Sequence, residues 1–81
     1  MNEVFVTPSV GRIVRYHSYG SPGGEFKPEP RAAIVTAVHD LTADGWVISL
    51  CAFNPTGMFF NQNVKYSRDP KPGHWSWPPK V

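Results

Sequence analysis

Two apolar stretches joined by a polar turn dominate the hydropathy pattern of the chain. Residues 46–53 have the sequence WVISLCAF, and the apolar run Met58-Phe59-Phe60 follows the tetrapeptide Asn54-Pro55-Thr56-Gly57. This tetrapeptide has Asn first, Pro second and Gly fourth, which is typical of a type I β-turn. Pro55 also disfavours helical geometry at the preceding residue. The pattern predicts a hairpin whose first strand is central and covered on both faces.

Further strands are predicted on either side of this hairpin. Residues 10–19 are rich in β-branched and aromatic side chains, which favours a strand. Residues 31–40 also carry apolar side chains at helical spacing, so a helix is the alternative there. Four β-branched residues in this segment favour a strand instead. Residues 64–66 form a further short strand after the polar run Asn61-Gln62-Asn63.

Two segments rich in Pro and Gly limit the regular structure. Residues 20–30 contain three Gly and three Pro, which predicts a long loop with Phe26 docked on the body of the domain. The Pro-rich tail, residues 69–81, cannot be a helix. Trp75 and Trp77 point the same way in an extended chain, and we expect the tail to close a barrel or to border a groove. The prediction is a single all-β domain over residues 1–81, an SH3-like or OB-like barrel of about five strands.

Composition narrows the function classes. Eight Lys and Arg against six Asp and Glu give the 81 residues a formal net charge of +2. These charges are scattered, so the basic stripe of a protein that binds duplex nucleic acid is not expected. One Cys excludes an internal disulfide and fits a reducing compartment. With no leader-like start and no apolar run of about 20 residues, the expectation is a protein of the host cytosol, away from membranes.

No catalytic or metal-binding arrangement is expected. His17, His39 and His74 lie in three separate segments, at no spacing typical of metal ligands. Cys51 sits in an apolar strand, where a free thiol is usually an inert core residue. The Gly-rich residues 20–24 lack the ending of a phosphate-binding loop, although a small anion nest there is an alternative to a plain connector. The sequence therefore predicts neither an enzyme nor a cofactor.

Aromatic, arginine and amide side chains alternate along the chain. Such side chains suit a ligand made of a base and a phosphate, but a small core with a polar rim contains the same types. For Phe59 and Trp46 the core is the favoured interpretation, whereas both interpretations stay open for the residues of the loop and tail. The predicted ligand-binding set has three roles: stacking by Tyr19, Phe26, Trp75 and Trp77, phosphate binding by Arg15 and Arg31, and base-edge contacts by Asn61 and Asn63.

The strings VGRIVRYHSYGSPGGEF, RAAIVTAV, LCAFNPTGMFFN and PGHWSWP resemble those of a family of small proteins of tailed phages and prophages, mostly of actinobacteria. The resemblance covers residues 10–79. It implies a phage context and no particular chemistry.

Three functions follow as hypotheses. The leading one is a non-enzymatic protein that sequesters a nucleotide-like small molecule, similar to the phage sponge proteins that capture host immune nucleotide signals. The second is an interaction module that inhibits or redirects a host protein through an aromatic rim. The third is a virion or assembly component, which would form a homo-oligomer through an apolar patch.

Overall fold

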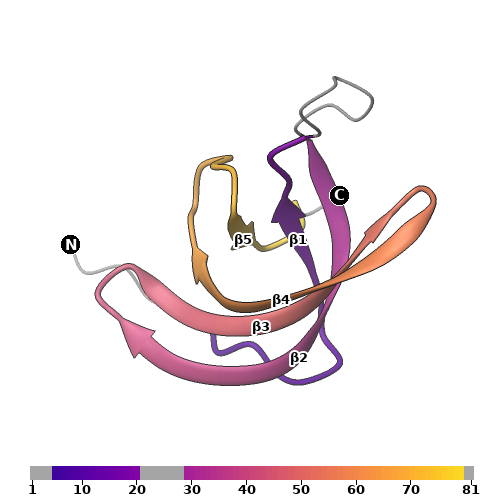
Figure 1. Ribbon diagram of the computed structural model, residues 1–81. Helices are drawn as coiled ribbons and strands as arrows, with labels where there is room; N and C mark the ends of the chain where they lie inside the picture. The colour runs from indigo at the N-terminus through magenta and orange to yellow at the C-terminus, as the bar shows by residue number, and fades with distance from the viewer. Residues whose placement is uncertain (1–4, 21–28, 80–81) are drawn as a thin grey trace.

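Five strands form one closed barrel in the computed structural model, which describes residues 5–20 and 29–79 (Figure 1). The strands are β1 (Ile13–His17), β2 (Pro30–Thr42), β3 (Gly45–Asn54), β4 (Gly57–Tyr66) and β5 (His74–Ser76). They follow one another round the barrel in sequence order, and β5 closes it against β1. The predicted all-β barrel of five strands is confirmed. Its sequential order differs from the Greek-key order of OB barrels and fits the SH3-like alternative.

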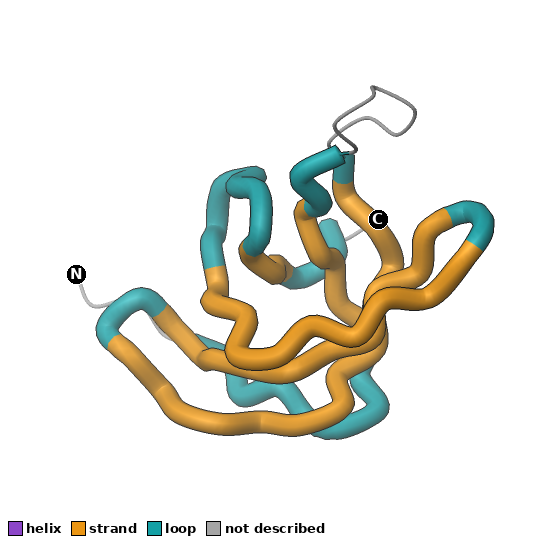
Figure 2. The backbone as a smooth tube through the Cα atoms, viewed as in Figure 1, coloured by secondary structure: helices purple, strands orange, loops and turns teal. Residues whose placement is uncertain are grey.

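Long antiparallel strands make most of the barrel wall. β2, β3 and β4 pair in an antiparallel meander, whereas the short β5 pairs antiparallel with β1 and parallel with β4. Figure 2 shows the described chain as strands joined by loops, without a helix. The strand predicted over residues 31–40 is therefore confirmed, since its β-branched side chains find partners on β1 and β3.

The β3–β4 hairpin turns at the predicted tetrapeptide and projects beyond the barrel (Figure 1). Asn54 pairs with Gly57 and closes the turn. β4 then continues through the polar run Asn61-Gln62-Asn63, where the sequence suggested a break between two short strands. β3 is buried on both faces only between Ile48 and Ala52, so the predicted coverage holds for its middle alone.

Two bulges meet at Ser49 and bend the wall. On one side Val35 pairs with Leu50 and Ala37 with Ser49, so β2 has an extra residue. On the other side β4 places two residues opposite Ser49, and one of them, Asn63, has a φ of 55°. Asn tolerates this left-handed conformation better than most residues. Bulges increase strand twist, which lets three long strands curve into a small barrel.

The core is small and is completed by β5. Trp75 is only 1% exposed and lies among aliphatic side chains, and its Nε1–H donates to the carbonyl oxygen of Trp46 at 2.8 Å. The buried apolar cluster consists of Val14, Ala33, Val35, Ile48, Leu50, Ala52, Val64 and Trp75. The expectation that the tail closes the barrel is met by this residue.

One predicted core residue lies outside the core. Phe59 is 55% exposed because it stands opposite Ala52, on the part of the hairpin that runs past the barrel. Trp46, the other residue assigned to the core, is partly buried and packs against the core cluster.

Candidate functional site

The two tail tryptophans occupy different environments: Trp75 is buried, whereas Trp77 is half-buried and lines a cavity of about 730 Å³. Trp75 is a core residue, so its ring faces cannot receive a ligand in this fold. Trp77 packs edge-on against Trp75, with ring centroids 5.3 Å apart, and the guanidinium of Arg12 lies 5.5 Å from its ring centroid. Both indoles were predicted to stack on a ligand. The structure buries Trp75 in the core and packs one edge of Trp77 against it, so the stacking role of Trp77 stays a prediction.

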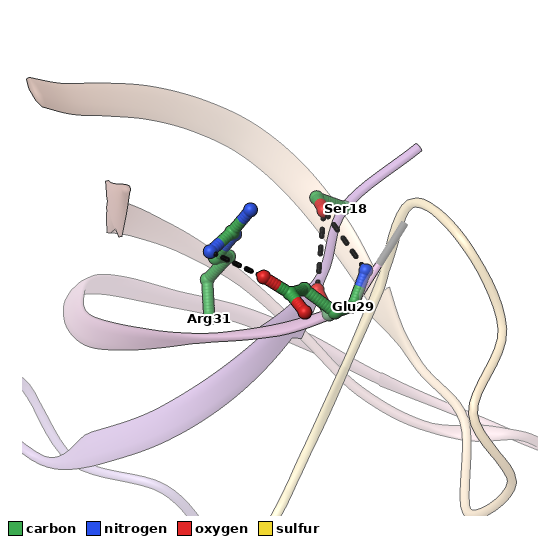
Figure 3. A network of polar contacts seen from close by, with 3 residues as sticks. All are labelled: Ser18, Glu29 and Arg31. Carbon is green, nitrogen blue, oxygen red and sulfur yellow. Dashed lines mark hydrogen bonds and ion pairs between the residues drawn. The ribbon is translucent and has the colours of Figure 1, made fainter. Parts of the chain in front are cut away.

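Arg31 was predicted to bind phosphate, and in the structure it forms an ion pair with Glu29 at the start of β2. Its Nη1 lies 2.8 Å from Oε1 of Glu29, and Ser18 exchanges hydrogen bonds with the backbone of Glu29 at 3.1 and 3.3 Å (Figure 3). Arg31 is largely buried, and this carboxylate neutralises its charge, while its Nε–H has no hydrogen-bond partner among the described residues. These contacts join the chain after β1 to the start of β2. Phe26 lies outside the described residues.

The remaining predicted residues lie in separate places. Arg15 lies on β1, where it pairs with Ala32 of β2 and Ser76 of β5, and its side chain is half-buried. Tyr19 is 70% exposed, and its hydroxyl covers Gly73, which has a φ of 79°. The predicted set as a whole is therefore not gathered into one cavity.

Asn61 and Asn63 do share a groove, which lies at the double bulge. The groove has a volume of about 450 Å³ and also receives His39, Ser49 and Phe60. The Asn63 amide N–H donates to Ser49 Oγ at 3.4 Å, and Nε2 of His39 lies 2.7 Å from the same oxygen. This Ser–His contact was not predicted from the sequence.

The Ser49–His39 pair lacks the rest of a hydrolytic site. A nucleophilic serine needs a base that is itself oriented by a third group. In the part of the chain that the structure describes, no carboxylate is hydrogen-bonded to His39. The Asn63 amide also donates to the serine oxygen. The pair therefore fits a structural role, in which hydrogen bonds to Ser49 connect the two bulges.

A cationic pocket lies where β4 and β5 run side by side. Lys65, Arg68, Lys71 and His74 line a cavity of about 300 Å³, with Asp44 as the single carboxylate in its wall. Lys65 and His74 are direct neighbours in the parallel pairing of the two strands. Among the described residues, the only ion pair joins Arg31 and Glu29, so no carboxylate neutralises the three Lys and Arg side chains of the pocket at contact distance.

The segment that carries these cations is held by its own hydrogen bonds. The Ser67 amide donates to the Trp75 carbonyl at 3.0 Å, and the His74 amide donates to the Lys71 carbonyl at 3.1 Å. The His74 ring contacts the Pro72 carbonyl through Nδ1 at 3.0 Å. A carbonyl oxygen only accepts, so this contact places a proton on Nδ1 and leaves Nε2 as the other polar atom of the ring.

Aromatic rings form one wall of the cationic pocket. Phe5 and Tyr66 line it, with their ring centroids 5.9 Å apart in an edge-to-face arrangement. Tyr66 in turn packs edge-to-face on Trp75 at 5.0 Å, so the wall is continuous with the core. A fixed ring beside three cations is an arrangement that suits a phosphorylated ring compound. The signal in the sequence was the recurrence of Lys65, Arg68, Lys71 and His74 at every third position.

A second Ser–His contact is structural and sensitive to pH. His17 is buried, and its Nε2 lies 2.8 Å from Ser76 Oγ, which joins β1 to β5. Burial lowers the pKa of His17 below its usual value of about 6.5, and the nearby charges of Arg15 and His74 lower this pKa further. His17 is therefore held neutral in the folded barrel.

We expect the barrel to lose stability in mild acid through His17. The unfolded chain takes up a proton near pH 6.5, whereas the folded chain takes it up only at lower pH. The contribution of His17 is complete above about pH 6.5 and is lost as the pH falls through the lowered pKa. Urea unfolding at a series of pH values measures this loss. His17→Gln should remove that part of the pH dependence and His39→Gln should keep it, so identical curves for wild type and His17→Gln would contradict the assignment.

Residues 5–20 and 29–79 were compared with the requirements of a metal site and of a membrane-spanning helix. No group of three His, Cys, Asp or Glu side chains there could hold a metal ion. The same residues contain no helix long and apolar enough to cross a membrane.

Comparison with known proteins returns no match: no family model, no curated protein and no solved structure is similar to this chain at a significant level. The resemblance to phage proteins stays a prediction.

Proposed function

We propose that this barrel is a non-enzymatic binding protein for a small phosphorylated, nucleotide-like ligand, and that the cationic pocket is its site. One observation carries the proposal. Three cationic side chains, Lys65, Arg68 and Lys71, converge on one cavity without a described carboxylate partner and beside the rings of Phe5 and Tyr66.

The charges in the pocket favour an anionic ligand. Like charges gathered in one place repel one another and favour a negatively charged occupant, and bonds from Lys and Arg to phosphate are the stronger kind of hydrogen bond. Its volume of about 300 Å³ is at the lower end of the usual range for small-molecule sites. These features favour a compact mononucleotide or a similarly sized phosphorylated ring compound. In a phage context, such a protein would act by sequestering the ligand.

We expect single charge removals in the pocket to weaken binding by about 10-fold to 100-fold. Lys71→Gln or Arg68→Gln removes a charge-assisted hydrogen bond worth about 1.5–3 kcal/mol, and 1.4 kcal/mol corresponds to tenfold in affinity. The measurement is isothermal titration with inorganic phosphate, nucleoside monophosphates and cyclic nucleotides, after native mass spectrometry of the purified protein has shown any retained ligand.

Arg15→Gln is the matched control for these variants. It removes the same single charge from β1, at a position outside the pocket, so its affinity should stay within about twofold of wild type. If Arg15→Gln and Lys71→Gln weakened ligand affinity equally, the loss would come from the change in net charge and not from the pocket. Flat titrations of the wild-type protein with every phosphate compound would remove the proposal.

A second candidate function, an interaction or assembly module, is favoured by a different observation. Apolar side chains follow one cross-strand row, from Ile13 on β1 through Ile34 and the buried Cys51 to Phe60 on β4. Ile13, Ile34 and Phe60 are exposed, and contiguous apolar surface of this kind marks interaction sites.

A further inference from the structure

We infer that β4 pairs with β4 of a second copy of this chain, antiparallel and about a two-fold axis, so that two barrels form one dimer across their β3–β4 hairpins. The inference is independent of the cationic pocket. It concerns the first part of β4, residues 57–63, which we call the open edge.

The open edge has a strand partner on one side only. β4 pairs with β3 from Gly57 to Val64, but it pairs with β5 only through Lys65 and Tyr66. Within the described residues, the hairpin therefore runs past the closed part of the barrel with one side of β4 free of strand pairing (Figure 1). A free edge presents amide and carbonyl groups that can pair with another strand.

The open edge has no charge or proline to discourage such pairing. Its sequence, GMFFNQN, contains neither a charged residue nor a proline, and the bulge at Asn63 lies at its far end. Monomeric β-proteins usually protect an edge with charges, proline or bulges. The same barrel shows such protection elsewhere: the part of β2 beyond Val35 carries His39, Asp40 and two register shifts.

The side chains of the open edge expose apolar surface that a partner could bury. Met58, Phe59 and Phe60 are 61%, 55% and 75% exposed, and Phe53, directly opposite Met58, is also exposed. Taking about 200 Å² for each large side chain, these four expose roughly 400–500 Å² of apolar surface. That is more than half of the roughly 800 Å² that each partner buries in a stable interface.

A second copy is the occupant that these features fit. Two identical uncharged strands pair antiparallel without like-charge repulsion, and a two-fold axis makes the contact closed rather than open-ended. With the axis at Phe60, the centre of the open edge, the two Phe60 rings face each other across the new strand pair. The apolar row from Ile13 to Phe60 then continues from one barrel onto the next.

Sedimentation velocity and light scattering over a wide micromolar concentration range test the dimer. The wild-type chain should pass from monomer to a discrete dimer as its concentration rises. Phe60→Lys places two like charges opposite each other at the axis and should raise the dissociation constant at least about tenfold. Leu41→Lys, at a position that is 54% exposed on β2, is the matched control and should dimerise as wild type. Far-UV circular dichroism confirms that each variant is folded.

A crosslink places the axis. Residue 60 is the cross-strand partner of Cys51, so Phe60→Cys is made in a Cys51→Ala background to avoid an internal disulfide. Paired antiparallel residues lie about 4.5–5.5 Å apart, within disulfide range, so mild oxidation should give a covalent dimer, and Leu41→Cys in the same background should not. A monomer at every concentration, a dimer unaffected by Phe60→Lys, or an open series of larger species would each overturn the inference.

Discussion

Trp75→Ala is expected to remove a large part of the protein's stability. Removing a fully buried aromatic side chain costs about 3–5 kcal/mol, and a domain of this size has a total stability of about 4–12 kcal/mol. Trp75 contributes more than volume, because Tyr66 and Trp77 pack against its ring and its Nε1–H satisfies the Trp46 carbonyl. Near-UV circular dichroism and urea unfolding should show lost tertiary packing and a transition shifted to much lower denaturant.

Two other substitutions separate the contributions of Trp75. Trp75→Phe keeps a ring in the core but leaves the Trp46 carbonyl without its donor, so a smaller loss of about 1–3 kcal/mol is expected. Trp77→Ala removes a half-buried ring and should cost less than Trp75→Ala. A Trp75→Ala protein with native near-UV spectrum and unchanged unfolding midpoint would show that the barrel does not depend on this residue.

Gly45→Ala is expected to destabilise the barrel strongly. Gly45 begins β3 with a φ of 124°, and a Cβ there would lie 2.8 Å from Cδ2 and 3.0 Å from Cβ of Tyr66. The Cβ of Tyr66 moves only with its backbone, so rotation of the ring does not remove the clash. Backbone strain of about 1–3 kcal/mol and overpacking of a similar size give an expected loss of about 2–5 kcal/mol, measured as a lower melting temperature.

Gly11→Ala supplies the control that separates strain from crowding. Gly11 has a φ of 91°, but no atom lies within 4 Å of an added Cβ. Its expected cost is therefore the strain alone, about 1–2 kcal/mol. Equal losses at Gly11 and Gly45 would show that contact with Tyr66 contributes nothing.

The strands were predictable because their signals are local. The turn Asn54-Pro55-Thr56-Gly57 fixed the position of one hairpin, and β-branched side chains separated strand from helix in β2. β1 begins at Ile13 rather than Val10, since the Arg12 amide bonds the Ser9 carbonyl and Gly11 has positive φ. Only the folded chain shows that the preceding residues form a turn.

The candidate site was harder to predict because burial depends on which strand ends extend past the barrel. Phe59 and Trp75 are both large aromatic residues, yet Phe59 lies on the β3–β4 hairpin and Trp75 on the strand that closes the core. The alternation of rings, arginines and amides therefore mixed core, loop anchors and surface in one predicted set. The cationic pocket was missed because its aromatic wall includes Phe5, which reaches Tyr66 only through the tertiary fold.

The place of β5 in the chain also determines when the barrel can form in the cell. His17 and Ser76, which join the two closing strands, are 59 positions apart in sequence. At a synthesis rate of about 5–20 residues per second, the ribosome makes β5 some 3–12 s after β1. During that interval the strands already made lack Trp75, and their inner face cannot be sealed. The newly made chain thus exposes apolar side chains for seconds. During this period chaperones have access to them.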